Sequence, residues 1–200
     1  MGADVIISGG QTANPSTKEF VDAFDKCNSE HIIVLPNNKN VFLAAKQAAE
    51  IYENATIHIV ETKSLMQGYS ALSVITPGIT DMDSLVQSAN RAASGVIDGE
   101  ITKAVRDVTI GDKHVTEGDY IAISCGEITS VADSAEKAVL GMLRAADTDL
   151  AEIITLFVGN DVTSESRAEL TEKLKQDYPD CEIVVYEGGQ AVYDYLVTVE

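Results

Sequence analysis

The sequence contains no tryptophan, and aromatic residues make up only 6% of its 200 residues. Any hydrophobic core must therefore be aliphatic, and a hydrophobic content of 45% suffices for one large domain or two small ones. The sequence shows no apolar run long enough to span a membrane and no signal peptide. These absences predict a cytoplasmic protein without a membrane span.

Basic residues are also scarce, because 14 lysines and arginines stand against 32 aspartates and glutamates, for a formal net charge of −18. So acidic a chain repels phosphate backbones, and nucleic acid is not expected as a partner. The acidity has two interpretations. It either forms a docking face for a basic partner or is the ordinary solvated surface of a cytoplasmic protein, which is the commoner case.

Cysteine and histidine are few and widely spaced. Cys27, Cys125 and Cys181 are odd in number and lack C-x-x-C spacing, so neither a disulfide framework nor a zinc site is predicted. Cys27 falls on the apolar stripe of an expected helix and Cys181 opens an expected strand, which favours core packing for both. The histidines at positions 31, 58 and 114 are equally scattered and do not predict a metal site.

Familiar catalytic motifs are missing. The sequence has no G-x-x-x-x-G-K-[ST] loop, no G-x-G-x-x-G after a strand and no G-x-S-x-G elbow. The tripeptide GGQ occurs twice, at 9–11 and 188–190, but three residues are too few to indicate a site. A nucleophilic Cys125 close to Glu127 is one alternative, although capping a strand end is the commoner role for such a turn. No catalytic residue is predicted.

The sequence does contain alternating strand and helix patterns in its first part. Short apolar runs predict buried parallel strands at 4–8, 31–36 and 55–60. Ser16 and Glu19 form a capping-box pattern before a helix, and a further short helix is expected over 67–75. Strands with intervening helices imply βαβ units with right-handed crossovers.

Pro77-Gly78 interrupts this alternation and marks the expected boundary between lobes at 1–80 and 81–200. Turn signals in the segment 99–123 separate short strands and predict an antiparallel meander. The later elements are expected as a helix over roughly 131–146, strands at 152–158 and 181–187, and a terminal short helix and strand. The predicted fold class is α/β, with a parallel first lobe and a mixed second lobe.

Polar residues gather where the first-lobe strands are expected to end, which is the edge where open α/β sheets bind ligands. The candidate ligand residues are Gln11, Thr12, Asn14, Asn37, Asn38, Lys39, Asn40, Thr62, Lys63 and Ser64. Two lysines and a helix N-terminus favour a carboxylate or phosphate. The alternative is structural, because Asn and Gly form turns and both Ser16 and Asn40 are good N-caps.

Three segments, ISGGQTANPST, VLPNNKNV and ETKSLMQGYSAL, resemble the carboxyl-terminal region of FakA, the catalytic component of bacterial fatty acid kinases, in a family related to dihydroxyacetone kinases. GEITKAVRDV, EGDYIAI and YEGGQAVYDYLVTVE fit the same family, so the resemblance covers almost the whole chain. The same region resembles a diverged copy of the DegV fold, which is the fold of the fatty-acid-binding partner, FakB. A two-lobed DegV-like architecture is therefore expected.

In DegV proteins a T-S-Q-P-S-P loop and an S-G-T loop hold the lipid carboxylate through hydroxyl groups. The matching positions here read GGQTANPST and NNKN, with Thr12 nearby but displaced. The resemblance thus implies vestigial ligand loops that keep their shape without the hydroxyl donors. It also implies that a further strand and glycine loop precede MGADVIISGG in family members, so an excised piece lacking an edge strand is expected.

The resemblance implies a non-catalytic domain of a fatty acid kinase. Such a domain would dock the fatty-acid-binding protein so that its acyl carboxylate is phosphorylated by the kinase domain of the same full-length chain. ATP and magnesium are expected in that separate domain, and no cofactor in these 200 residues. The alternatives are a small-anion or fatty-acid binding module using the loops around Gln11, Asn38 and Lys63, and an independent enzyme using Cys125. A homodimer is also possible.

Overall fold

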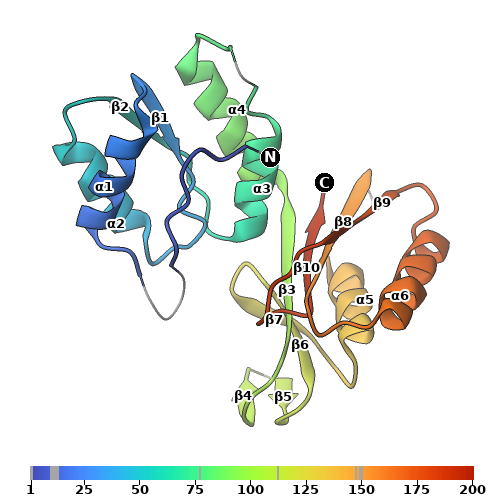
Figure 1. The fold of residues 1–200 in the computed structure, drawn as a ribbon. Coiled ribbons are helices and arrows are strands. Elements are labelled where there is room, and N and C mark those ends of the chain that lie inside the picture. The colour runs from blue at the N-terminus through green and yellow to red at the C-terminus, as the bar shows by residue number, and fades with distance from the viewer. Residues whose placement is uncertain (1, 10–13, 77, 112, 147, 149–150) are drawn as a thin grey trace. The chain divides into compact units, whose positions relative to one another are not determined.

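The chain forms two compact units, Met1–Gly95 and Val96–Glu200, in the computed structural model (Figure 1). The structure describes all residues except 1, 10–13, 77, 112, 147 and 149–150. The α/β class is confirmed, with a mixed sheet in the second unit. The last helix of the first unit follows Pro77-Gly78, where the sequence placed the start of the second lobe. This helix packs in the first unit because its Ala89 and Ala93 share a core cluster with Val60.

The first unit alternates helices and strands. Its elements are α1 (Thr17–Cys27), β1 (His31–Val34), α2 (Phe42–Ile51), β2 (Thr56–Ile59), α3 (Leu65–Ser73) and α4 (Met82–Gly95). β1 and β2 pair in parallel, as predicted, with His31 opposite Thr56 and Ile33 opposite His58. Alternate residues therefore face opposite sides. Ile32 packs with helices α1 and α2, whereas Ile33 packs with α3 and α4.

The prediction of a strand at 4–8 is wrong, because these residues have no strand pairing among the described residues. Ile7 packs on the core of the first unit, but Ile6 is 81% exposed. An apolar run becomes a strand only when a neighbouring strand satisfies its backbone groups.

The capping box that begins α1 is confirmed. The Ser16 N–H donates to Glu19 Oε2 at 2.8 Å, and the Glu19 N–H donates to Ser16 Oγ at 3.3 Å. The hydrogen bonds that the Ser16 N–H and the Ser16 hydroxyl donate to the Glu19 carboxylate hold its pKa below the ordinary value. The box satisfies the first free N–H groups of the helix and so sets its starting residue.

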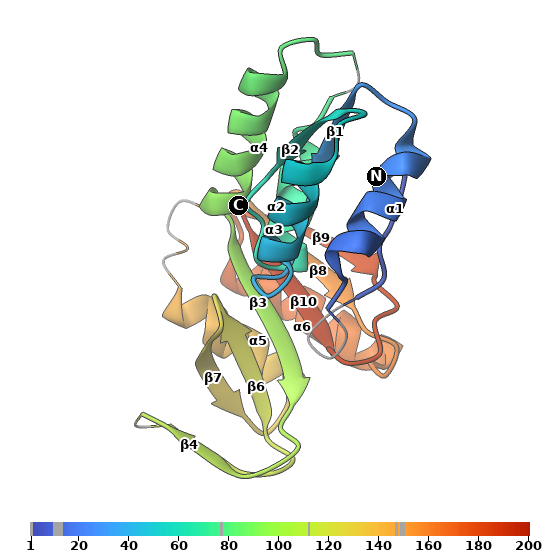
Figure 2. The ribbon, with the colours of Figure 1, turned by 90° about the vertical axis from the view of Figure 1, so that its left-hand side faces the viewer.

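The described residues of the second unit form a six-stranded sheet, a hairpin and two helices. Its elements are β3 (Ile97–Lys103), β4 (Val108–Ile110), β5 (Lys113–Val115), β6 (Tyr120–Ser124), β7 (Glu127–Ala132), α5 (Ala135–Ala145), β8 (Ile153–Val158), α6 (Ser164–Asp177), β9 (Glu182–Glu187) and β10 (Tyr195–Val199). The sheet order is β7-β6-β3-β10-β8-β9, in which β8 and β9 pair in parallel and the other neighbouring strands pair antiparallel. Figures 1 and 2 show the β4–β5 hairpin projecting beyond the end of this sheet.

Antiparallel pairing within 99–123 is confirmed for β3 with β6 and for β4 with β5, although β4 and β5 form a separate two-stranded sheet, and two predictions farther along the chain are wrong. The helix expected from 131 begins at Ala135, because β7 occupies the segment up to Ala132. The terminal short helix is absent, since residues 188–194 are irregular among the described residues. They form hydrogen bonds with neighbouring strand ends instead, as when the Asp194 N–H donates to Ile101 O at 2.8 Å.

The core of the second unit is aliphatic, as the lack of tryptophan required. Its buried members come mainly from β8, β10, α5 and α6 and include Ile154, Leu156, Val197, Val139, Met142 and Leu170. Every residue of β10 is buried, and the strand pairs with β3 on one side and β8 on the other. Cys181 packs on this core and Cys27 on the core of the first unit, as predicted, and burial raises the pKa of both thiols.

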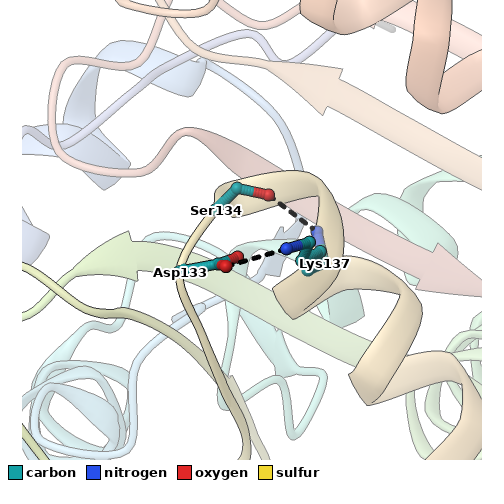
Figure 3. Close-up of polar contacts among 3 residues, drawn as sticks. All are labelled: Asp133, Ser134 and Lys137. Carbon is teal, nitrogen blue, oxygen red and sulfur yellow. Dashed lines mark hydrogen bonds and ion pairs between the residues drawn. The ribbon is translucent and has the colours of Figure 1, made fainter.

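The start of α5 offers a direct test of local stability. The Lys137 N–H donates to Ser134 Oγ at 3.3 Å, and Lys137 Nζ lies 2.8 Å from Asp133 Oδ2 (Figure 3). We expect Ser134→Ala to lower the free energy of unfolding by about 1 kcal/mol, because one helix N–H loses its partner. Denaturant unfolding followed by circular dichroism measures this change. Ser164→Ala, at an exposed position in α6, is the control, and equal losses in both variants would contradict the prediction.

Candidate functional site

The loops that follow β1 and β2 meet at the carboxyl ends of these two parallel strands. The Asn37 N–H donates to Thr62 Oγ1 at 2.9 Å, and Thr62 is only 1% exposed. This contact joins the loop 37–40 to the loop 62–64, which the predicted topology placed at the same edge. Asn14 is exposed, and no hydrogen bond within the described part of the chain links it to either loop. Gln11 and Thr12 lie outside the described residues.

Asn37 is held in an unusual backbone conformation against the first turns of α3. Its φ is 56°, in the left-handed region of backbone conformation that residues other than glycine and asparagine rarely adopt. A Cβ atom on Gly68 would lie 2.0 Å from Asn37 Oδ1, so only glycine leaves room for this amide. Asn37 Oδ1 is buried and accepts no hydrogen bond from the residues that the structure describes. An acceptor without a donor is costly, and it also repels a carboxylate.

The remaining asparagines of this loop form a turn. The Asn40 N–H donates to Asn38 Oδ1 at 2.8 Å, and the Val41 N–H donates to Asn38 O at 3.2 Å. This is an Asx turn, in which the side chain replaces a backbone acceptor. The prediction of Asn40 as an N-cap is wrong, because Val41 precedes α2 and provides no side-chain cap.

Ser64 begins α3 and is nearly buried. Its Oγ accepts a hydrogen bond from the Gln67 N–H at 3.1 Å, while the Lys63 N–H donates to Gln67 Oε1 at 2.8 Å. Gln67 was not among the predicted site residues, because the helix was expected to begin there. The spacing S-x-x-Q, a known signature of a helix start, could have identified it.

Two lysines and two leucines stand exposed around these loops, and we call them the loop rim. Lys39 and Lys63 form no ion pair among the described residues. Leu43 and Leu65, in the first turns of α2 and α3, are 65% and 54% exposed. Cationic and apolar groups side by side are the chemistry that an amphiphilic anion would find favourable, and the N-terminus of α3 adds partial positive charge.

Cys125 occupies the turn between β6 and β7 with a φ of 54°. Its N–H donates to Asp98 Oδ1 at 3.4 Å, and its Sγ lies 3.6 Å from the same oxygen. Asp98 is 4% exposed, and a neighbouring carboxylate opposes formation of a nucleophilic thiolate. His114, the one histidine in the sequence of this unit, is hydrogen-bonded to Thr109 Oγ1 at 3.1 Å in the hairpin. The surroundings of Cys125 therefore do not form a cysteine–histidine pair.

A cleft of about 270 Å³ lies beside Cys125. It is lined mainly by apolar or uncharged side chains, namely Val96, Ile97, Ser124, Thr129, Met142, Ala145 and Ala146. Such walls provide no group for acid–base catalysis.

The second GGQ segment is a structural turn. Gln190 Nε2 donates to Phe157 O at 2.8 Å, and Asn160 Nδ2 donates to Gly189 O at 2.8 Å. The nearby titratable groups are carboxyls and a phenol. Burial and the adjacent Glu100 raise the pKa of the Tyr193 phenol to about 12. Burial likewise raises the pKa of the Asp194 carboxyl. The described residues that line this turn are acidic, phenolic or uncharged.

Neither a cluster of metal-binding side chains nor a membrane-spanning helix is found among the described residues. They contain no group of three or more His, Cys, Asp and Glu side chains placed to hold a metal ion. None of the helices described combines the length and the hydrophobicity that a membrane crossing requires.

The whole chain, residues 1–200, matches the model of the FakA-like, C-terminal family of fatty acid kinase proteins. It is 35% identical over 205 residues to Protein YloV of Bacillus subtilis, and the match covers all of this chain and 36% of YloV. The chain therefore spans about a third of the length of the curated relatives that it matches.

Solved structures share the fold. The Streptococcus pneumoniae fatty acid kinase B3 protein, loaded with linoleic acid, has a TM-score of 0.64 at 13% identity, covering 93% of this chain and 76% of its own. A DegV family protein of Corynebacterium glutamicum has a TM-score of 0.66 at 14% identity, with coverages of 93% and 83%. The dihydroxyacetone kinase of C. freundii has a TM-score of 0.60 at 15% identity, with coverages of 94% and 41%.

At these identities the structural likeness shows the fold alone, and it confirms the expected DegV-like architecture. The sequence match is closer and extends from the first residue to the last. This chain belongs to the FakA-like, C-terminal family of fatty acid kinase proteins.

Proposed function

We propose that this chain is the non-catalytic docking domain of a fatty acid kinase. It binds a DegV-like fatty-acid-binding protein, whose acyl carboxylate it presents to a separate kinase domain of the full-length chain. ATP and magnesium belong to that kinase domain in this proposal. Family membership and the shared fold of the linoleic-acid-loaded B3 protein support the fatty acid kinase context.

The internal hydrogen bonding of the two loops is the observation that supports a docking domain which itself neither catalyses the reaction nor binds the lipid. The backbone N–H groups of Asn37, Asn40 and Lys63 all donate to side chains within the loops or the adjoining helix turn. A bound carboxylate needs such donors, because both of its oxygens only accept hydrogen bonds. Loops whose N–H donors are already hydrogen-bonded internally are better suited to a structural role than to binding a lipid carboxylate.

The charge of the chain supports docking to a basic surface. Most of its acidic residues lie in Val96–Glu200, where 22 aspartates and glutamates stand against 8 lysines and arginines. A field of one sign speeds the encounter with a partner of opposite charge and is screened by salt. The association rate is therefore expected to fall as the salt concentration rises.

Calorimetric titration of this chain with a DegV-like fatty-acid-binding protein from the same organism tests the proposal. We expect a one-to-one complex whose affinity weakens with salt, and unequal affinities for the lipid-free and lipid-loaded partner would show that the domain senses the cargo. The control is the DegV-like protein titrated into buffer and into an unrelated acidic protein. The absence of both binding heat and co-elution at low salt would refute docking.

The loop rim favours a second function, the binding of a small anion or fatty acid at Lys39 and Lys63. Thermal unfolding with fatty acids and acyl phosphates tests it, because ligand at ~100 times its dissociation constant adds roughly 2.7 kcal/mol of stability. The double variant Lys39→Gln/Lys63→Gln should lose any shift, whereas Lys18→Gln in α1 should keep it. An unchanged melting temperature across the ligand panel would exclude this function and leave docking in place.

A further inference from the structure

Two histidines that are far apart in the sequence meet on one face of the first sheet. His31 begins β1 and His58 lies in β2, with His31 opposite Thr56 and His58 opposite Ile33. Side chains two residues apart on a strand share a face, so both imidazoles stand on the side of Ile33. The distance between His31 Nδ1 and His58 Nε2 is 3.1 Å, and the ring centroids are 5.3 Å apart.

We propose that His31 and His58 form a two-imidazole site for a divalent transition-metal ion such as Zn²⁺, Cu²⁺ or Ni²⁺. Imidazole nitrogens are the side-chain ligands that these ions share. In the metal-free protein one ring donates its N–H to the lone pair of the other. On metal binding the donor ring releases that proton to water and takes one up on its other nitrogen, so both rings stay neutral and each presents one lone pair to the metal.

The geometry of the pair matches chelation. Nitrogen ligands lie about 2.0–2.1 Å from zinc, so two of them at a tetrahedral angle are about 3.4 Å apart and two at a right angle about 2.9 Å. The observed 3.1 Å lies between these limits, so a rotation of the two rings is expected to suffice to direct both lone pairs at one ion. Parallel pairing in register holds the two ligands at this separation.

The rest of the coordination sphere is open. Among the residues that the structure describes, no third histidine, cysteine or carboxylate joins the pair. His31 is exposed and His58 is half-buried, so water reaches the remaining positions. A site with two protein ligands and exchangeable water is expected to bind its ion reversibly rather than to hold the fold together.

Calorimetric titration of the tag-free, metal-stripped chain with zinc chloride tests this site, in excess magnesium to occupy carboxylates. We expect one reversibly bound zinc ion per chain, and His31→Gln or His58→Gln should each weaken its binding at least tenfold, since even outer-shell changes cost about 10–100-fold. His114→Gln is the matched control, because this histidine contacts Thr109 in the hairpin, and it should leave zinc binding unchanged.

Electron paramagnetic resonance of the copper-loaded wild-type chain provides a readout that does not depend on how well the variants fold. Its spectrum should show coupling to two imidazole nitrogens, and to one in each single variant that retains the wild-type circular dichroism. The site is refuted if the wild type shows no two-nitrogen signal, or if folded His31→Gln and His58→Gln bind zinc as tightly as His114→Gln.

Discussion

Replacing Gly159 with alanine is expected to destabilise Val96–Glu200 by about 3 kcal/mol, at the upper end of what overpacking usually costs. A Cβ at this position would lie 2.2 Å from the carbonyl oxygen of Tyr193 and 3.1 Å from that of Asp194. These are backbone atoms, which cannot rotate away as a side chain can. The turn after β8 would have to separate from the segment before β10, where the Gly159 N–H donates to Asp194 O at 2.8 Å.

Denaturant unfolding followed by circular dichroism measures this loss. The matched control is Gly95→Ala at the end of α4, where a Cβ would meet no atom within 4 Å. Its free energy of unfolding should stay within about 0.5 kcal/mol of wild type or rise slightly, because alanine favours helix over glycine. If Gly159→Ala unfolds at the wild-type denaturant concentration, the close approach of the Tyr193 carbonyl is not a property of the folded chain.

Gly68→Ala is expected to cost about 2 kcal/mol, because its Cβ would force the Asn37 side-chain amide out of the space beside α3. When Asn37 is first replaced by glycine, Gly68→Ala is expected to stabilise the chain instead of destabilising it. Glycine adopts a φ of 56° without strain, and the substitution removes a buried oxygen that has no donor among the described residues. With Asn37 replaced, Gly68→Ala fills the vacated space and gains about 0.5–1 kcal/mol of helix propensity.

The sign of the Gly68→Ala effect therefore depends on residue 37. A double-mutant cycle measured by thermal or denaturant unfolding gives the coupling energy between the two positions directly. Gly141→Ala in α5 is the comparison, because its Cβ would meet mainly the Ser130 hydroxyl. Both residues lie in Val96–Glu200, so Asn37→Gly should leave the effect of Gly141→Ala unchanged. Equal effects of Gly68→Ala with and without Asn37→Gly would show that the amide does not occupy this space.

Much of the local structure follows from patterns only a few residues long. The capping box of Ser16 and Glu19 begins α1 as predicted, and the apolar runs of β1, β2, β8 and β9 all form strands, because periodicity and capping act within one or two turns of chain. The meeting of Asn37 and Thr62 was also predictable, since parallel strands joined by a helix bring their carboxyl ends together.

The sequence by itself thus determined the fold class, the aliphatic core, the family and the edge where the candidate loops lie. Only the tertiary structure decided that residues 4–8 form no strand, that β10 lies between β3 and β8, and that His31 meets His58. It also decided that the Asn37 N–H is already hydrogen-bonded to Thr62. The physical reason is the same in each case. A strand needs a partner, and a polar contact needs a second group, and both come from residues remote in the sequence.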